Sequence, residues 1–230
     1  MNIQPIYIFL LLFLASSGCR TVEPGAVESL PLCAITYPDK VKPEDFRGLR
    51  LNPIYRIDVE GYASPDQGAD SRNAAELFSR LRELPLGKMP TCVSEVYRLT
   101  WVPSFHRTTT VRIWASEDGY LINTKRLERT AENRNGHTYT ETTRQLSDGE
   151  WQSFRDSIDK FDFWHVASTE DEPIPNDGAA WLLEGSKAGE YHSVFRIGPN
   201  IEFERLIRKI FATSGETTEI DLYLTAAPAN

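Results

Sequence analysis

Three polar residues near the C-terminal end of the sequence have the types and spacing that could support chemistry. Glu184 and His192 stand on either side of a short turn, and Arg196 follows His192 in the same segment. A carboxylate beside an imidazole can orient the ring and stabilise its protonated form, as general acid–base catalysis requires. Glu184, His192 and Arg196 are therefore the candidate polar cluster, and a hydrolase is one function that they could serve.

The turn between these residues decides whether their side chains meet. Lys187-Ala188-Gly189 predicts a three-residue hairpin loop, because a type I turn followed by a glycine commonly connects antiparallel strands. This register places Glu184 opposite His192, and the two-residue repeat of a strand puts Arg196 on the same face. The alternative interpretation of the same register is a cross-strand charge pair that only fixes the pairing of the strands.

The remaining histidines do not form a recognisable metal motif. His106, His137 and His165 are scattered along the chain, and none stands one helical turn from another histidine, as helical zinc motifs require. No serine or cysteine has the sequence context of a known nucleophile. We therefore expect no metal and no cofactor, the sequence assigns no catalytic residue, and the balance is against an enzyme.

The candidate cluster must be positioned by strands, which outnumber helices in this sequence. Segments with alternating or β-branched character lie at 54–59, 97–102, 109–115, 120–123, 137–146, 181–184, 191–197 and 220–224. Asp118-Gly119 is a hairpin signal between two of these segments. Few predicted helices interrupt the strands, and those that do come late in the chain. This order of elements predicts an α+β fold, in which an antiparallel sheet of hairpins or a meander carries two to three amphipathic helices on one face.

Three segments have the signals of amphipathic helices. Ser147 and Glu150 match a capping box at the start of one helix. Asn200 and Gly215 mark the start and the end of another. A further helix is predicted over residues 71–84, where apolar residues recur at helical spacing before a proline. We expect the apolar sides of these helices to cover the sheet.

The N-terminal segment indicates where the protein resides. An apolar run at residues 6–15 is followed by Ser16-Ser17-Gly18 and then Cys19. The run has about ten residues, roughly half of what a membrane-spanning helix needs, so residues 1–18 are predicted to be a signal peptide. Small residues followed by a cysteine resemble the lipobox of bacterial lipoproteins, which implies that Cys19 is lipidated with acyl chains such as palmitate. Ordinary secretion with an unmodified Cys19, or an uncleaved anchor, are the alternatives.

The lipoprotein resemblance also implies a compartment. Arg20 stands where an aspartate would be the familiar inner-membrane retention signal, so the periplasmic face of the outer membrane is favoured over a secreted or periplasmic protein. Assigning Cys19 to lipid leaves Cys33 and Cys92 as an even pair in an oxidising compartment, which predicts a disulfide. That bond would close a loop of about 60 residues and contribute roughly 4 kcal/mol. Two buried thiols are the alternative.

Composition limits the domain count and the kinds of partner. The chain has 230 residues, 40% of them hydrophobic, and a formal net charge of −8. Residues 19–52, rich in proline and charge, predict a tether, and residues 53–230 predict one α+β domain. The acidic balance argues against nucleic acid as a partner.

A wider pattern surrounds the candidate cluster. Its residues are Asp177-Gly178-Ala179, Trp181, Leu183-Glu184-Gly185, Tyr191-His192, Arg196 and Pro199, with Tyr97, Trp101, Ser104-Phe105-His106, Leu146-Ser147 and Glu150-Trp151 upstream. This pattern resembles a family of uncharacterised exported bacterial proteins, and the resemblance covers about residues 95–215. It implies a shared architecture and carries no activity, cofactor or partner with it.

These observations together predict a lipid-anchored protein of the cell envelope that has a binding or structural role. Its partners would be the membrane, through the N-terminal lipid, and an envelope protein or a small ligand. A hydrolase using Glu184 and His192 is one alternative. An inhibitor or immunity protein for an envelope toxin is another, because an acidic domain can steer onto a basic toxin.

Overall fold

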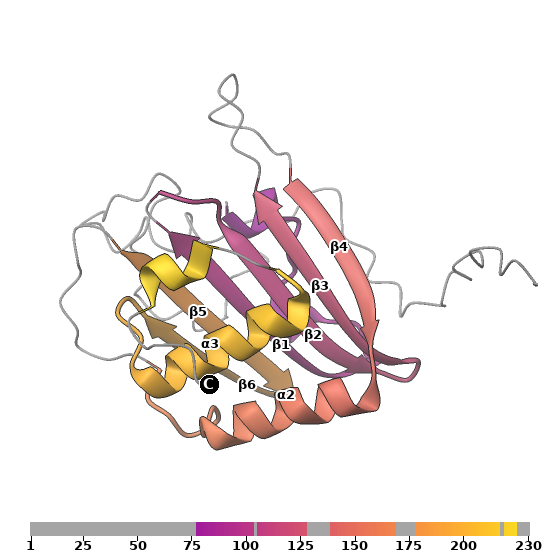
Figure 1. Cartoon of the computed structure of the whole chain (residues 1–230). Helices are drawn as coiled ribbons and strands as arrows, with labels where there is room; N and C mark the ends of the chain where they lie inside the picture. The colour runs from indigo at the N-terminus through magenta and orange to yellow at the C-terminus, as the bar shows by residue number, and fades with distance from the viewer. Residues whose placement is uncertain (1–76, 104, 128–138, 169–177, 217–218, 225–230) are drawn as a thin grey trace, which may run out of the picture. The chain divides into compact units, whose positions relative to one another are not determined.

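A six-stranded antiparallel sheet forms the centre of the described residues (Figure 1). The computed structural model describes residues 77–103, 105–127, 139–168, 178–216 and 219–224. The strands are β1 (Val93–Pro103), β2 (Thr109–Ser116), β3 (Gly119–Leu127), β4 (Tyr139–Leu146), β5 (Ala179–Lys187) and β6 (Glu190–Arg196). Their order across the sheet is β4-β3-β2-β1-β5-β6.

The connectivity explains this strand order. β1 to β4 form a meander in which each strand pairs with the next, and β5 then returns to pair with the free side of β1. Leu99 lies opposite Leu183 and Trp101 opposite Trp181, so large apolar side chains share one face at the centre of the sheet. A slip of one residue would turn these side chains to the other face, so their burial fixes the register.

Two helices cover one face of the sheet, which we call the helix face (Figure 1). They are α2 (Asp148–Lys160) and α3 (Ile201–Ser214). The sheet residues buried in this core include Tyr97, Leu99, Trp101, Val111, Ile113, Ile122, Trp181, Leu183 and Val194. The rings of Trp101 and Trp181 stack with centroids 5.6 Å apart, and Phe211 of α3 meets both of them edge-on. The fold is therefore α+β, with the helices packed on one face of the antiparallel sheet, as expected.

The helix boundaries follow the predicted caps. The Glu150 backbone N–H donates to Ser147 Oγ at 3.3 Å, and the Ser147 N–H donates to Glu150 Oε2 at 2.9 Å, which completes the capping box. At the start of α3, the Phe203 N–H donates to Asn200 Oδ1 at 3.0 Å. Gly215 ends α3 in the left-handed conformation, with φ 77°. Both starts and the stop are confirmed.

The other face of the sheet is covered by residues 77–88, which we call the strap, and we call this face the strap face. Residues 77–80 are helical, and the strap ends in the short 3-10 helix η2 (Leu86–Lys88). Leu81 packs near Leu127 at one end of the strap, and Leu86 packs against Val96 and Trp114 at the other. Residues 71–76 of the helix predicted over 71–84 lie outside the described residues. Its predicted end was wrong, because the helix stops at residue 80 and residues 81–84 form a turn and irregular chain in which Arg82 has a positive φ of 51°.

The C-terminal prediction was wrong in one respect. Residues 220–224 were expected to form a strand, but the 3-10 helix η3 (Glu219–Tyr223) occupies this position. Ile220 and Leu224 are buried, whereas Leu222 is 73% exposed. Burial therefore recurs at helical spacing, and the alternation of apolar residues that indicated a strand does not correspond to two faces. The strand predicted at 54–59 lies outside the described residues, as do the signal peptide and the tether.

Candidate functional site

The turn between β5 and β6 differs from the predicted one by a single residue. Lys187 pairs with Glu190, so the loop consists of Ala188 and Gly189 only. Both residues have positive φ, 51° and 82°, as a type I′ turn requires. The right-handed twist of the flanking strands favours this turn in two-residue hairpins. The predicted three-residue loop was therefore wrong.

This one-residue shift separates the members of the candidate polar cluster. Glu184 pairs with Ser193, and His192 pairs with Gly185. Because side chains alternate along a strand, Glu184 points to the strap face, while His192 and Arg196 point to the helix face. The sequence-based expectation that the three side chains meet on one face is thus incorrect, and the hydrolase built on Glu184 and His192 loses its geometric basis.

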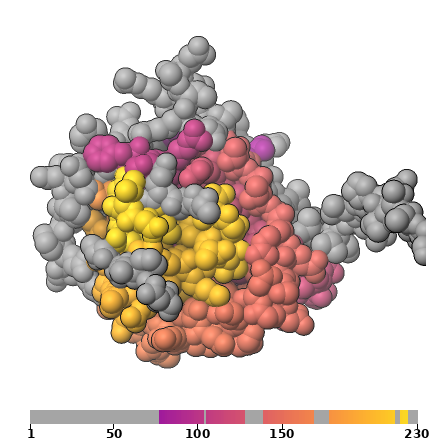
Figure 2. Space-filling model, in the orientation of Figure 1, coloured from indigo at the N-terminus to yellow at the C-terminus, as the bar shows by residue number. Residues whose placement is uncertain are grey.

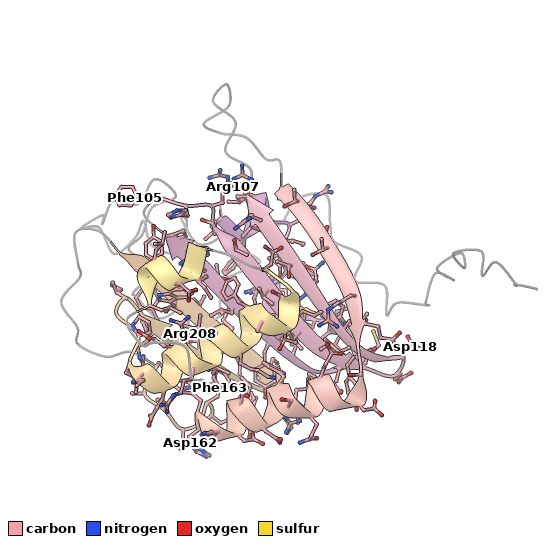
Figure 3. The ribbon with its side chains drawn as sticks, viewed as in Figure 1. Phe105, Arg107, Asp118, Asp162, Phe163 and Arg208 are labelled. Carbon is pink, nitrogen blue, oxygen red and sulfur yellow. The ribbon has the colours of Figure 1, made fainter. Side chains whose placement is uncertain are left out.

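His192 is part of an aromatic contact at the end of the helix face. Its ring meets the Phe163 ring edge-on, with centroids 5.1 Å apart, and its Nε2 donates to the Val166 carbonyl at 3.1 Å. Burial lowers the pKa of His192, although the Val166 carbonyl acts in the opposite direction. Phe163 belongs to the turn after α2 (Figure 3). His192 therefore fastens this turn to β6.

Arg196 fastens the next residues of the same segment. Its Nη2 donates to the Ala167 carbonyl at 2.8 Å, and its Nη1 to the Ser168 carbonyl at 3.3 Å. The Phe195 N–H also donates to Ser168 O, at 2.8 Å. The guanidinium is almost fully buried and lies beside backbone acceptors. Its position supports a role in holding the chain after α2 against β6.

Glu184 belongs to a buried ionic cluster on the strap face. Arg98 Nε donates to Glu184 Oε2 at 2.8 Å, Arg98 Nη2 lies 2.6 Å from the same oxygen, and the Tyr191 hydroxyl donates to Oε1 at 3.0 Å. The side chains of Arg98 and Glu184 are fully buried. Burial, followed by the negative charge of Glu184, raises the pKa of Tyr191 far above its ordinary value.

Glu83 of the strap is the second carboxylate of this cluster. Its Oε2 lies 2.9 Å from Arg112 Nη1 and 3.4 Å from Arg98 Nη1, and its Oε1 lies 3.0 Å from Lys125 Nζ. We call Arg98, Arg112 and Lys125 the cation floor. Burial lowers the pKa of Arg112 to about 10, so its guanidinium stays charged at neutral pH. Burial also lowers the pKa of Lys125, and the charge of Glu83 counteracts this effect.

Backbone carbonyls of the strap also contact the cation floor. Lys125 Nζ donates to Arg82 O at 2.9 Å, and Arg98 Nη1 donates to Leu84 O at 2.6 Å. No motif in the sequence predicted this cluster. Charged residues alternate with apolar ones along β1 to β3, and that pattern is also typical of a strand with one wet face. Nothing in the strand sequences indicates that a segment from elsewhere in the chain covers them.

The remaining residues considered in the sequence are the other histidines and the cysteines. His106 Nδ1 lies 2.7 Å from the Tyr223 hydroxyl, and among the described residues no group of three or more His, Cys, Asp or Glu side chains could hold a metal ion. Cys92 lies in the turn before β1. Cys19 and Cys33 lie outside the described residues, so lipidation and the Cys33–Cys92 disulfide stay predictions.

The outer strand β4 offers a different kind of site. Its side chains from Thr140 to Gln145 are exposed on both faces of the strand. Asn123 Nδ2 of β3 donates to Glu141 Oε1 at 2.7 Å and to Thr143 Oγ1 at 2.8 Å, which orders the surface of the strand. In the described part of the chain no strand pairs with the outer edge of β4 (Figure 1), and Figure 2 shows the side of β4 and α2 at the molecular surface.

The fold and the site together define this protein as an α+β protein with one polar edge strand and one sheet face that buries a cluster of ion pairs. Comparison of the sequence with family models found no match, and comparison with curated proteins found none either. Its function must therefore be inferred from its own residues.

Proposed function

We propose that this is a lipid-anchored protein of the cell envelope that binds an extended segment of a partner polypeptide along β4. The proposed location in the cell envelope is based on the lipobox-like residues that end at Cys19. The binding mode derives from one observation, the exposed outer edge of β4. No helix among the described residues is long and apolar enough to cross a membrane.

An exposed edge strand is a template for strand addition. Its outward N–H and C=O groups can pair with another chain, and many peptide-binding domains use such an edge. Proteins commonly protect their edges with proline, bulges, short strands or a covering segment. β4 is a regular strand of eight residues without proline or glycine, and its pairing with β3 has no bulge.

The charged side chains of β4 leave this edge accessible. Glu141 accepts a hydrogen bond from Asn123, on the strap face of the strand. Arg144 points to the helix face, where its Nη2 donates to Glu150 Oε1 at 2.8 Å and to the Thr213 carbonyl. Both charges are thus directed to neighbouring elements. The middle of the outer edge is formed by threonines, whose branched side chains suit β pairing.

Proline substitutions at two neighbouring threonines test the proposal. In an antiparallel strand, the N–H groups of successive residues point to opposite edges. Of Thr142→Pro and Thr143→Pro, one therefore removes a hydrogen bond to β3 and destabilises the fold, and the other removes only an outward donor. Thermal unfolding of the two variants identifies which is which.

The binding measurement uses short peptides selected from a displayed random library against the full-length protein in detergent. The outward proline should abolish binding of the selected peptides, while its threonine-to-alanine counterpart at the same position should bind normally. Hydrogen exchange should slow in β4 when a peptide binds. Equal binding to the wild-type protein and to the stable proline variant would contradict strand addition at β4.

A further inference from the structure

The cation floor holds the carboxylate of Glu83 as a protein site holds a bound carboxylate ligand. We propose that Arg98, Arg112 and Lys125 form a carboxylate-binding site, which Glu83 fills from within the chain and which an external carboxylate can fill when Glu83 is withdrawn. This inference does not depend on β4 or on the lipid anchor.

Both oxygens of Glu83 are engaged, as they would be in a bound carboxylate. Lys125 binds Oε1 at 3.0 Å, and Arg112 binds Oε2 at 2.9 Å. Arg98 approaches Oε2 at 3.4 Å with Nη1. Arginine is the cation best suited to planar carboxylates, and charge-assisted hydrogen bonds of this kind are the stronger ones in proteins. The donors come from three neighbouring strands.

The sheet brings the backbone of the three cations together independently of the strap. Arg98 and Arg112 are direct partners across β1 and β2, and Lys125 pairs with Thr110 across β2 and β3. Arg98 is additionally held by Glu184 through Nε and Nη2. Cross-strand pairing therefore keeps the backbone of the three cations together, and Arg98 retains its Glu184 contact when the Glu83 carboxylate is absent. Such preorganisation favours ligand binding.

Two buried hydroxyls lie next to the floor on the same face. Thr100 and Thr110 are direct partners across β1 and β2, and they are 2% and 1% exposed. Their Oγ1 atoms have no hydrogen-bond partner in the described structure. A buried hydroxyl without a partner is unfavourable, and a small oxygen-rich ligand would satisfy it. These hydroxyls are a second, independent indication of a polar ligand.

The strap is built so that apolar residues hold its ends and Glu83 fills the site between them. Leu81 and Leu86, on either side of Glu83, are almost fully buried in separate apolar clusters. Glu83 is the one acidic residue in the sequence of 77–88. A buried ionic cluster is a costly way to fasten a segment, because packed apolar side chains often stabilise a protein more. The polar centre is therefore better explained by an ability to bind a carboxylate.

Glu83→Ala tests the proposal by chemical rescue. This truncation leaves Cβ in place and removes a volume equal to one acetate, while the three cations stay. The thermal midpoint of the variant should fall, and acetate added in exchange for chloride at constant sodium concentration should restore it saturably, by about 5 °C at high occupancy. Methylammonium, which has the wrong charge, should not restore it. Propionate, one methylene longer, should act more weakly.

Matched variants make the result specific. Glu83→Gln keeps the volume but not the charge, so it should be destabilised and should not respond to acetate. Glu150→Ala removes an exposed carboxylate from Arg144 and should respond no more than the wild-type protein. If Glu83→Ala does not fold, the same titration followed by far-ultraviolet circular dichroism reports folding driven by acetate. A response of Glu83→Ala no larger than that of the wild-type protein would overturn the proposal.

Discussion

Gly185 is the position where a single added methyl group tests the packing of the helix face most sharply. A Cβ there would lie 2.6 Å from Phe163 Cε1 and 3.0 Å from Tyr97 Cδ1. Real Cβ contacts essentially never fall below 3.0 Å, so a ring would have to move. Tyr97 is held by the Glu95 carboxylate at 2.7 Å and by the edge of Phe154, and Phe163 is fully buried.

Because neither ring has space, Gly185→Ala should destabilise the fold. Overpacking of this kind costs about 1–3 kcal/mol, although replacing a glycine within a strand returns roughly 0.5–1 kcal/mol. For a domain of this size we expect a fall in the thermal midpoint of about 2–8 °C. Urea unfolding should show the same loss with an unchanged slope, since one methyl group hardly changes the surface that unfolding exposes.

Gly149→Ala is the matched control for this substitution. Gly149 lies in the first turn of α2, and nothing lies within 4 Å of a Cβ added there. The same chemical change should therefore stabilise the protein, by up to about 1 kcal/mol, because alanine favours the helix. If Gly185→Ala proved as stable as the wild-type protein, the close packing of Gly185, Phe163 and Tyr97 described above would be incorrect.

Three further predictions concern the turn, the histidine and the cysteines. Ala188→Asn should raise the free energy of unfolding by about 0.5–1 kcal/mol, measured in urea, because asparagine tolerates the positive φ of a type I′ turn better than alanine; a loss of stability would argue against this turn. The folded-state pKa of His192 is lowered by burial, so the folded protein binds fewer protons than the unfolded chain as the pH falls below about 6.5. The free energy of unfolding should therefore fall as the pH is lowered through this window, and the fall should be smaller in His192→Gln. Intact mass of the native protein, taken without reductant, should show acyl chains on Cys19 and two hydrogens fewer for a Cys33–Cys92 disulfide, whereas a soluble product with all thiols free would contradict both.

Local signals in the sequence predicted helix and hairpin positions well where one residue caps unpaired backbone groups or adopts the φ that a turn requires. Ser147 and Asn200 identified the starts of the two helices, and Gly215 identified the end of α3, because capping depends on neighbours within one turn. The Asp118-Gly119 signal gave the β2–β3 hairpin, whose pairing ends at Ser116 and Gly119. The fold class followed from the order of these elements.

The β5–β6 register could not be obtained in the same way. A type I′ turn is usually indicated by Asn-Gly or Asp-Gly in the sequence, whereas here Ala188 occupies the first position with positive φ. With alanine there, Lys187-Ala188-Gly189 fits a three-residue loop equally well. An error of one residue in a strand changes which face every side chain occupies. For this reason the loop prediction, wrong by one residue, placed Glu184 on the wrong face of the sheet.

The two faces of the sheet differ in what covers them, and this difference explains how the ionic cluster persists. The helix face buries stacked and edge-on aromatic rings around Trp101 and Trp181, which supply a large favourable term for folding. Because the helix face stabilises the fold, the strap face can bury Arg98, Arg112 and Lys125 despite the free energy lost when charges leave water. This requires that carboxylates pair with them. Glu184 and Glu83 meet them in different ways. Glu184 belongs to the sheet itself, whereas Glu83 lies on a separate segment with apolar contacts on either side of it. The proposed withdrawal of Glu83 therefore requires the strap to move and not the sheet.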